Sequence, residues 1–200
     1  MTTNISLVGV GGQGTLLTSD ILAKVAMAAG LDVKKSEIHG MAQRGGSVIS
    51  QVRFGERVCS PIIADGTSDI LVSFDKLEAL RWKHLVRPQA RVLVNDLYLM
   101  PITVSTGQKA DVEDLDGELV RSFPGLLMVP AQRIAECDMG NSRCMNMVMA
   151  GAVSRFLAFP EELWLEVMRG RIPAKLLDLN IRAFAAGRAA TRSVVAPFMV

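Results

Sequence analysis

A glycine-rich run near the N-terminus is the first group of residues that could do chemistry. Residues 9–14 read GVGGQG, which satisfies the pattern GxGxxG directly after an apolar segment. Glycines let the chain turn tightly and bring backbone N–H groups, together with a helix N-terminus, close to an anion such as a phosphate. The candidate phosphate-binding residues are Gly11, Gly12, Gln13 and Gly14. The alternative is that these glycines only permit a tight strand-to-helix turn that packs against a partner.

A second glycine-rich loop carries the next candidates. Residues 39–46 read HGMAQRGG, and in a doubly wound sheet this loop would lie near the same sheet end as residues 9–14. Arg44 offers a rigid fork of N–H donors for a carboxylate or a phosphate, and Gly45 and Gly46 would let a second backbone approach closely. Alternatively, Arg44 caps a carbonyl or an acidic side chain of its own fold. The two remaining polar candidates in this loop are His39 and Gln43.

The third candidate stretch, residues 140–152, reads GNSRCMNMVMAGA. Asn141 is a favourable N-cap for a helix, and the small residues at the far end of the stretch allow close helix packing. The methionines are expected to fill the core or a subunit interface. Asn146 is the polar exception, because it needs a hydrogen-bond partner if it is buried.

The remaining reactive side chains do not form a catalytic or metal-binding pattern. Cys59, Cys137 and Cys144 are too few and too scattered for a disulfide framework, and none has the CxxC spacing of a zinc or iron–sulfur site. Two histidines, His39 and His84, are insufficient for a Ser/His/Asp or Cys/His arrangement. We therefore predict no catalytic residue and no metal ligand in this chain, and any redox metal is expected on another chain.

Composition and charge favour an ordinary soluble globular chain. Among 200 residues, 22 Lys and Arg balance 20 Asp and Glu to a net charge of +2, and 50% are hydrophobic. This balance argues against a nucleic-acid binder, which needs a clustered cationic face. No apolar stretch is long enough for a membrane span, and the N-terminus lacks the basic region of a signal peptide. We expect a cytoplasmic protein that contacts neither nucleic acid nor membrane.

Apolar segments that alternate between strand-like and helix-like patterns must position these loops. The expected strands are residues 5–10, 32–38, 48–54, 58–63, 69–74, 91–95 and 126–129. The expected helices are 15–29, 75–86, 131–138, 142–159 and two that begin at Pro160 and Pro173. The alternation predicts an α/β fold with a Rossmann-like, mostly parallel sheet and flanking helices, followed by a helical region from about residue 131. Residues 1–200 are expected to form a single domain.

Five short stretches together resemble one known family. They are GVGGQG at 9–14, RGG at 44–46, SDILVSFD at 68–75, VLVND at 92–96 and GNSRCMNM at 140–147. In this order and spacing they resemble the gamma subunit of 2-oxoacid:ferredoxin oxidoreductases over nearly the whole chain. The segment SEIHGMAQRGG, residues 36–46, is most similar to small subunits of the indolepyruvate type, since pyruvate-type chains usually have Tyr-Gly-Pro-Glu before the RGG.

The resemblance implies the small subunit of an enzyme that oxidatively decarboxylates indolepyruvate or another aryl pyruvate. Such enzymes use coenzyme A as co-substrate and ferredoxin as electron acceptor, and thiamine diphosphate and 4Fe–4S clusters do the chemistry. This chain has neither a thiamine signature nor cluster cysteines, so a large alpha subunit is expected to hold both, and this chain is expected to be active only with that partner. The glycine loops would hold a phosphate of coenzyme A, and Arg44 would pair with a phosphate or a carboxylate. Alternatively, both loops only dock the partner.

Other functions stay open at this point. A gamma-type chain of the same family could act on a different 2-oxoacid. A chain of the same fold could also be a stand-alone module that binds a nucleotide or coenzyme A. An NAD-dependent dehydrogenase is disfavoured, because nothing after Gly14 supplies a catalytic acid together with a substrate-binding arginine.

Overall fold

The structure is a computed structural model that describes residues 2–39 and 45–192. The central sheet has six strands, which are β1 (Thr2–Val10), β2 (Asp32–His39), β3 (Ser47–Gly55), β4 (Ser68–Ser73), β5 (Val86–Asn95) and β6 (Leu126–Val129). Their order in the sheet is β2-β3-β1-β4-β5-β6. Strands β1, β4, β5 and β6 are parallel to one another, and β3 runs antiparallel to both of its neighbours. The predicted α/β class is confirmed, with a mixed sheet in which parallel pairs are the majority.

The position of β3 brings the two glycine-rich loops to one end of the sheet. Strand β3 pairs antiparallel with β2, the strand before it in the chain, and inserts between β2 and β1. Val10 at the end of β1 pairs with Ser47 at the start of β3, while His39 at the end of β2 pairs with Val48. The loops after β1 and β2 therefore emerge side by side, as predicted. An antiparallel hairpin puts them there, not the doubly wound crossover that the sequence suggested.

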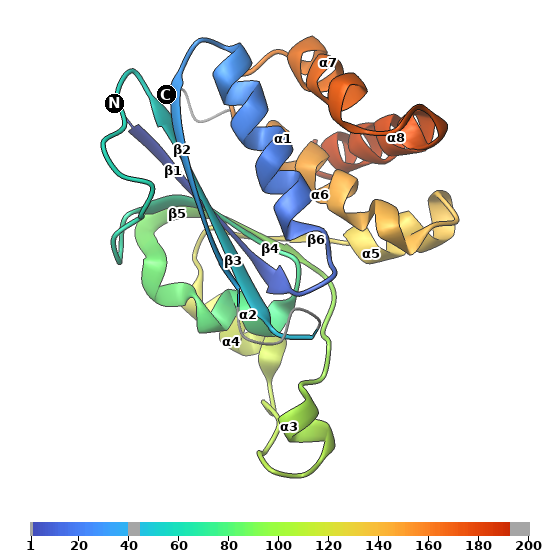
Figure 1. The fold of residues 1–200 in the computed structure, drawn as a ribbon. Coiled ribbons are helices and arrows are strands. Elements are labelled where there is room, and N and C mark those ends of the chain that lie inside the picture. Colours follow the sequence, from blue (N-terminus) through green and yellow to red (C-terminus); the bar gives the residue numbers. More distant parts are fainter. Residues whose placement is uncertain (1, 40–44, 193–200) are drawn as a thin grey trace.

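Helices cover both faces of the sheet (Figure 1). They are α1 (Thr15–Ala28), α2 (Lys76–Arg81), α3 (Ile102–Ser105), α4 (Leu115–Ser122), α5 (Ala131–Arg133), α6 (Met145–Ser154), α7 (Glu161–Arg171) and α8 (Ala174–Ala190). Three shorter turns, η1 (Lys83–Leu85), η2 (Ile134–Asp138) and η3 (Ser142–Cys144), adjoin α2, α5 and α6. One face carries α1 and α5 to α8, and the other carries α2 and α4. None of the helices in the described ranges is long and apolar enough to cross a membrane.

Two apolar layers hold these helices against the sheet. On β1, Ile5 and Leu7 belong to the layer shared with α1 and α6, while Val8 belongs to the layer shared with α2 and α4. This division follows from the alternation of side chains along a strand. All ten residues of α6 are buried, so its methionines are core residues, which confirms the first of the two roles expected for them. Burying an apolar side chain of that size contributes roughly 1.5–3 kcal/mol.

The strand expected at residues 58–63 is absent, and that prediction is wrong. A neighbouring side chain satisfies the backbone there: the Arg53 guanidinium donates to the carbonyls of Ser60 and Ile62, both at 2.8 Å. Backbone acceptors that are already bonded to a side chain are not available to a strand ladder. The apolar residues of this segment therefore pack as an irregular loop.

Two expected helices are shorter in the structure. The helix expected over 75–86 ends after six residues, and β5 already begins at Val86, which places Pro88 at an exposed position inside a strand. A proline is tolerated there because the ladder between β4 and β5 shifts register at this point. The helix expected over 142–159 divides into η3 and α6 and ends at Ser154.

Candidate functional site

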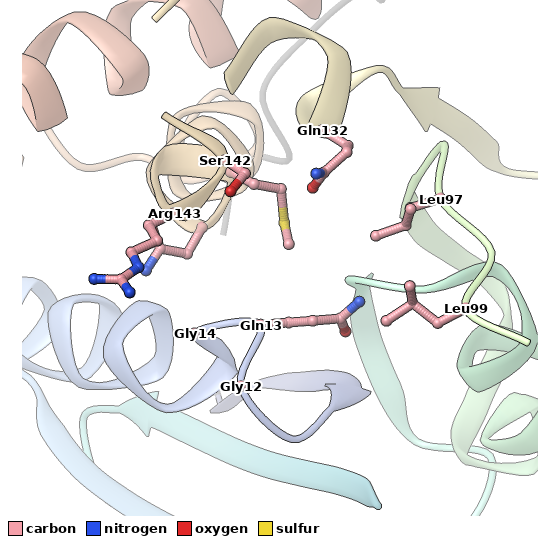
Figure 2. A pocket seen from close by; sticks show the side chains of 10 residues that line it. Gly12, Gln13, Gly14, Leu97, Leu99, Gln132, Ser142 and Arg143 are labelled. Carbon is pink, nitrogen blue, oxygen red and sulfur yellow. The ribbon is translucent and has the colours of Figure 1, made fainter. Parts of the chain in front are cut away.

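A cavity of about 460 Å³ lies at the carboxyl ends of β1, β5 and β6. Its walls are residues 12–14 after β1, Leu97 and Leu99 after β5, Gln132 after β6, and part of the segment 142–146. Figure 2 shows Leu97 and Leu99 on one side of the cavity and Ser142 and Arg143 on the other. Open α/β sheets bind ligands at this end of their strands. We therefore take this cavity as the candidate functional site.

The two glycine-rich loops meet through their backbones beside this cavity. Gly11 N donates to Gly46 O at 2.8 Å, and Gly45 N donates to Gly11 O at 3.4 Å. The expected proximity of the loops is thus confirmed for these three glycines. Gln43 and Arg44 lie outside the described residues.

Only part of the glycine loop is available to an anion. Gly12 and Gly14 have φ values of +106° and +85°, a conformation that side-chain-bearing residues rarely adopt. Within the described ranges their N–H groups donate to no acceptor, whereas Gly11 N is engaged as above and Gln13 N donates to Val10 O at 3.1 Å. Gly14 is the N-cap of α1, and no side chain caps that helix. The phosphate-binding hypothesis therefore narrows to the amides of Gly12 and Gly14.

The carbonyl of Phe74, just after β4, joins the loops around the cavity. It accepts from Gln13 Nε2 at 3.2 Å and from Asn95 Nδ2 at 3.1 Å. Asn95 is fully buried, and its Oδ1 accepts from Gln132 N at 3.0 Å. Gln13 Oε1 also accepts from Val10 N at 2.7 Å. These two amide side chains therefore hold four strand-end loops in one arrangement.

Asp75 fixes the apolar wall of the cavity. Its carboxylate is buried, accepts from Leu77 N at 2.8 Å as the N-cap of α2, and accepts from Leu99 N at 2.7 Å. Lys76 N donates to Leu97 O at 2.9 Å, so both wall leucines are tied to the start of α2. Burial raises the pKa of the Asp75 carboxyl above its ordinary value, against the opposing effect of its backbone hydrogen bonds. The position of this wall thus depends on a buried ionisable group.

Asn146, in the first turn of α6, closely approaches the start of α1. A Cβ on Gly14 would lie 2.4 Å from Asn146 Nδ2, and the Thr18 hydroxyl donates to the Asn146 carbonyl at 3.2 Å. The Asn146 residue is 7% exposed and lines the cavity, and its Oδ1 has no hydrogen-bond partner in the described part of the chain. An unsatisfied buried polar atom costs about 1–3 kcal/mol. The Asn146 side chain, which was a candidate from the sequence, therefore lacks the hydrogen-bond partner that a purely structural role requires.

Two further cavities adjoin the first around the N-terminus of α1. One of about 280 Å³ shares Arg143 and Asn146 with it, and one of about 290 Å³ shares Gly12 and Gly14. Asn141 caps η3 as predicted, since its Oδ1 accepts from Arg143 N at 3.1 Å. The Arg143 side chain is exposed and forms no ion pair with any described residue. Among the described residues, Arg143 therefore lines two of the cavities around the glycine loop, and Arg171 lines the one of about 280 Å³.

The reactive side chains do not converge on the cavity. Cys59 and Cys137 are exposed, whereas Cys144 is buried, and burial raises the pKa of its thiol. The described ranges contain no group of three or more His, Cys, Asp or Glu residues that could hold a metal ion. This donor set does not fit an iron–sulfur cluster, and a buried thiol with a raised pKa is a poor nucleophile.

Several residues that organise the site were not among the sequence-based candidates. They are Phe74, Asp75, Asn95, Leu97, Leu99 and Gln132. A signal existed for two of them, because Asp75 and Asn95 end apolar strand segments at the carboxyl side, where polar side chains usually contact a ligand or another loop. His39, which was a candidate, is the last residue of β2 and pairs through its backbone with Val48.

Residues 4–190 match the family model of the pyruvate ferredoxin/flavodoxin oxidoreductases. The chain belongs to this family. Its relatives include the indolepyruvate oxidoreductase subunit IorB of Archaeoglobus fulgidus, 38% identical over 94% of each chain. IorB of Thermococcus kodakarensis is 36% identical over 96% of this chain and 97% of its own. The 2-oxoglutarate synthase subunit KorC of Methanothermobacter marburgensis is 26% identical over 94% of this chain and 96% of its own.

Solved structures of oxidoreductases have the same fold as this family member. The gamma subunit of a keto/oxoacid ferredoxin oxidoreductase from Geobacter sulfurreducens gives a TM-score of 0.72 at 20% identity, covering 96% of this chain and 99% of that one. The 2-oxoglutarate:ferredoxin oxidoreductase from Magnetococcus marinus, with 2-oxoglutarate, coenzyme A and succinyl-CoA bound, gives 0.73 at 22% identity. That match covers 98% of this chain and 32% of the other, so the fold is one part of a longer chain there.

Proposed function

We propose that this chain is the small subunit of an indolepyruvate ferredoxin oxidoreductase. Such an enzyme oxidatively decarboxylates indolepyruvate or another aryl pyruvate, transfers the acyl group to coenzyme A and reduces ferredoxin. The observation that carries the proposal is the 35–38% identity with four IorB subunits over 94–96% of the chain. We propose a cytoplasmic location as well, since all three cysteines are free thiols.

In this proposal, the large alpha subunit holds the cofactors. Thiamine diphosphate and 4Fe–4S clusters supply the decarboxylation and electron-transfer chemistry when they are bound. The scattered thiols of Cys59, Cys137 and Cys144 do not suit a cluster, and the sequence has no thiamine signature. The small subunit therefore acts as one domain that helps to bind and orient the ligand and to shield the site. It is active only within the complex, which delivers electrons to ferredoxin.

We infer that the cavity at the carboxyl edge receives part of coenzyme A. The unengaged N–H groups of Gly12 and Gly14, at the N-terminus of α1, suit a phosphate oxygen, and Arg143 adds a positive charge at the rim. Arg44 stays a predicted partner of a phosphate or a carboxylate. The Magnetococcus marinus structure, one part of which has this fold, contains bound coenzyme A, which supports coenzyme A as a ligand of the assembled enzyme. The competing role for both loops is docking of the alpha subunit without ligand contact.

Another 2-oxoacid is the second candidate substrate. Two KorC subunits of 2-oxoglutarate synthases are 26% and 28% identical to this chain. The higher identity with the IorB subunits favours indolepyruvate. The substrate pocket itself would lie on the partner, so the assembled enzyme must decide between the two.

The proposal is tested by co-expressing this chain with the large subunit encoded beside it and purifying through a tag on this chain. We expect a brown complex that reduces ferredoxin or a viologen with indolepyruvate only when coenzyme A is present. Equal turnover with 2-oxoglutarate or pyruvate would shift the substrate assignment within the family. A colourless chain that purifies alone and still binds coenzyme A would instead indicate a stand-alone binding module.

A further inference from the structure

The segment between β5 and α4 forms an arm that stands away from the rest of the molecule. The arm covers residues 97–114 and includes the short helix α3, which projects beyond the carboxyl end of the sheet (Figure 1). Its tip is held by its own backbone, since Lys109 N donates to Thr103 O at 2.9 Å. None of the residues of α3 is buried. This helix therefore adds nothing to the core of the chain, and the arm needs another explanation.

Ion pairs and hydrogen bonds fix the base of the arm. Lys76 Nζ lies 2.6 Å from Asp96 Oδ1 and 2.8 Å from Asp116 Oδ1, so one side chain links the two ends of the segment. Within the arm, the Tyr98 hydroxyl donates to Asp111 Oδ1 and joins the outgoing and the returning chain. The arm is thus held in one direction. A surface that is fixed before binding loses less entropy when a partner covers it.

The arm gathers apolar side chains at the surface. Nine large hydrophobic side chains are exposed in the described part of the chain, and four of them lie within residues 99–112. Met100 is 56% exposed, and Ile102, at 73%, is the most exposed of the nine. Single exposed apolar residues are ordinary, whereas a group of them in one place marks a contact with another molecule. The arm is therefore a candidate protein–protein contact.

The charge of the arm restricts the chemistry of its partner. Between residues 97 and 118, Lys109 is the one basic residue, against five Asp and Glu. Val112, another of the exposed apolar residues, lies between Asp111 and Glu113. Complementary charge speeds association, and like charge excludes a partner. An apolar surface next to carboxylates fits a groove that is apolar at its floor and carries Lys or Arg at its rim.

The position of the arm selects the partner. Leu97 and Leu99, which form one wall of the cavity (Figure 2), belong to the base of the arm, and Met100 and Ile102 follow directly. In the proposed function, the cavity must open toward the cofactors, which the large subunit holds. A second copy of this chain seated on the arm would lie at the mouth of the cavity and separate it from those cofactors. The large subunit is therefore the partner that this position favours.

We propose that residues 97–114 are a docking arm, and that Met100 and Ile102 insert into an apolar groove with a basic rim on the large subunit. The inference rests on the proposed function, and it adds the surface of this chain through which the two subunits assemble. Residues 100–113 act on assembly and do not contact the ligand in the cavity.

The experiment is a competition for the large subunit. Wild-type chain with one tag and a variant with another tag are co-expressed with the large subunit, and complexes are captured through the large subunit. Both small subunits are then quantified by mass spectrometry relative to their amounts in the lysate. Met100→Lys and Ile102→Lys each place a positive charge in the apolar contact and against the basic rim. We expect the share of each variant to fall about tenfold or more below that of wild type.

Stability of the isolated variants separates docking from folding. Both side chains are exposed in this chain, so the urea midpoint of each variant should equal that of wild type. Met27→Lys and Ile62→Lys are matched controls, because they make the same changes at side chains that are 61% and 53% exposed at the opposite end of the sheet. Both controls should enter the complex as often as wild type.

Two outcomes of the competition would contradict the account in different ways. Equal shares for the arm variants and their controls would overturn this inference and leave the proposed function intact. A wild-type chain that does not assemble with the large subunit at all would overturn the proposed function, and this inference with it.

A photo-crosslinker on the arm identifies what covers it. Thr103→p-benzoylphenylalanine places the reactive group at an exposed position of α3. We expect cross-links to the large subunit in the assembled complex. Cross-links only to a second copy of this chain, or none at all, would overturn the inference.

Discussion

The glycines between α6 and α8 and the glycines of the loop after β1 serve different purposes. A Cβ on Gly187 would lie 1.9 Å from the carbonyl oxygen of Val148, and one on Gly151 would lie 2.0 Å from that of Phe184. Both obstacles are backbone atoms, which cannot turn aside. At the loop, in contrast, a Cβ on Gly12 would meet nothing within 4 Å, so that position needs glycine for its positive φ, and the obstacle to a Cβ on Gly14 is the side chain of Asn146 and not a backbone atom.

In the proposed function, this difference separates the part of the molecule that provides stability from the part that contacts the ligand. The contact of α6 with α8 is close: every residue of α6 is buried, as are Ala183, Phe184 and Gly187 of α8, and backbone atoms lie directly against Gly151 and Gly187. The loop after β1 has left-handed glycines, connected cavities and an unpaired Asn146. Asn146 belongs to α6, so one helix packs tightly along its length and offers a polar group at its first turn. The following variants test whether the two roles are separable.

The largest effect is expected from Gly187→Ala. The added Cβ forces α6 and α8 apart, which should lower the free energy of unfolding by about 3 kcal/mol, measured by urea denaturation of the isolated chain. Gly170→Ala is the matched control, because that glycine lies in α7 with nothing within 4 Å of an added Cβ. It should raise the free energy of unfolding by roughly 0.5–1 kcal/mol through helix propensity. Equal effects of the two variants would contradict the assignment of close packing.

The next effect is expected from Asn95→Leu. The change removes a bond to Phe74 O and leaves Gln132 N without its acceptor, which should cost about 2 kcal/mol. Because Asn95 then no longer links the loops around the cavity, KM for coenzyme A in the complex should also rise. Gln89→Leu is the control, since that amide lies at an exposed position of β5 away from the cavity. Loss of stability without any change in KM would show that the hydrogen bonds of Asn95 do not position the loops that line the cavity.

Gly14→Ala should affect recognition more than stability. The φ of +85° makes alanine strained by about 1–2 kcal/mol, and the added Cβ displaces the Asn146 amide. Gly140→Ala carries a similar strain, with φ of +66° and nothing within 4 Å of an added Cβ. Both should lower the free energy of unfolding, and Gly14→Ala should lower it further because its added Cβ also meets the Asn146 side chain. Only Gly14→Ala should raise KM for coenzyme A. Combining Gly14→Ala with Asn146→Ala should add little to the effect of either on KM.

The smallest expected effect is a change of the free energy of unfolding with pH. Burial raises the pKa of Asp75 in the folded chain above 3.8, its ordinary value, so the folded state binds this proton more tightly than the unfolded state. The Asp75 contribution to the free energy of unfolding therefore increases as pH falls through the folded pKa toward 3.8. Urea denaturation of wild type and Asp75→Asn at about pH 7 and about pH 5 should show the difference shifting in favour of wild type at the lower pH. A shift in the opposite direction would mean that the ionised carboxylate is the form that the fold prefers.

The fold was largely predictable, because the local patterns agree with the final elements. Residues 126–129 form β6 as expected, and α7 and α8 begin directly after Pro160 and Pro173. The order of the strands was not predictable, since hydrophobic periodicity does not record that β3 inserts beside β1. The loop at 58–63 was also missed, because the Arg53 side chain replaces a strand partner there and no local pattern reveals such a contact.

The candidate site was predictable only where residue type itself carries the signal. The spacing of Gly12 and Gly14 identified the loop, and Asn146 stood out as a polar residue in an apolar helix. The Phe74 carbonyl that links the loops belongs to the backbone, so the residue type at position 74 does not predict this role. The wall formed by Leu97 and Leu99 depends on hydrogen bonds from distant segments, which the sequence does not specify locally.

The central claim, that the cavity of this chain takes part in coenzyme A binding within a two-subunit oxidoreductase, is tested most directly by amide hydrogen exchange. The wild-type complex is compared with and without coenzyme A, and peptides of both subunits are followed by mass spectrometry. We predict slower exchange in the peptides that cover residues 12–14, 97–99 and 142–146, with α8 unchanged. Protection confined to the large subunit, with this chain unaffected, would contradict the account.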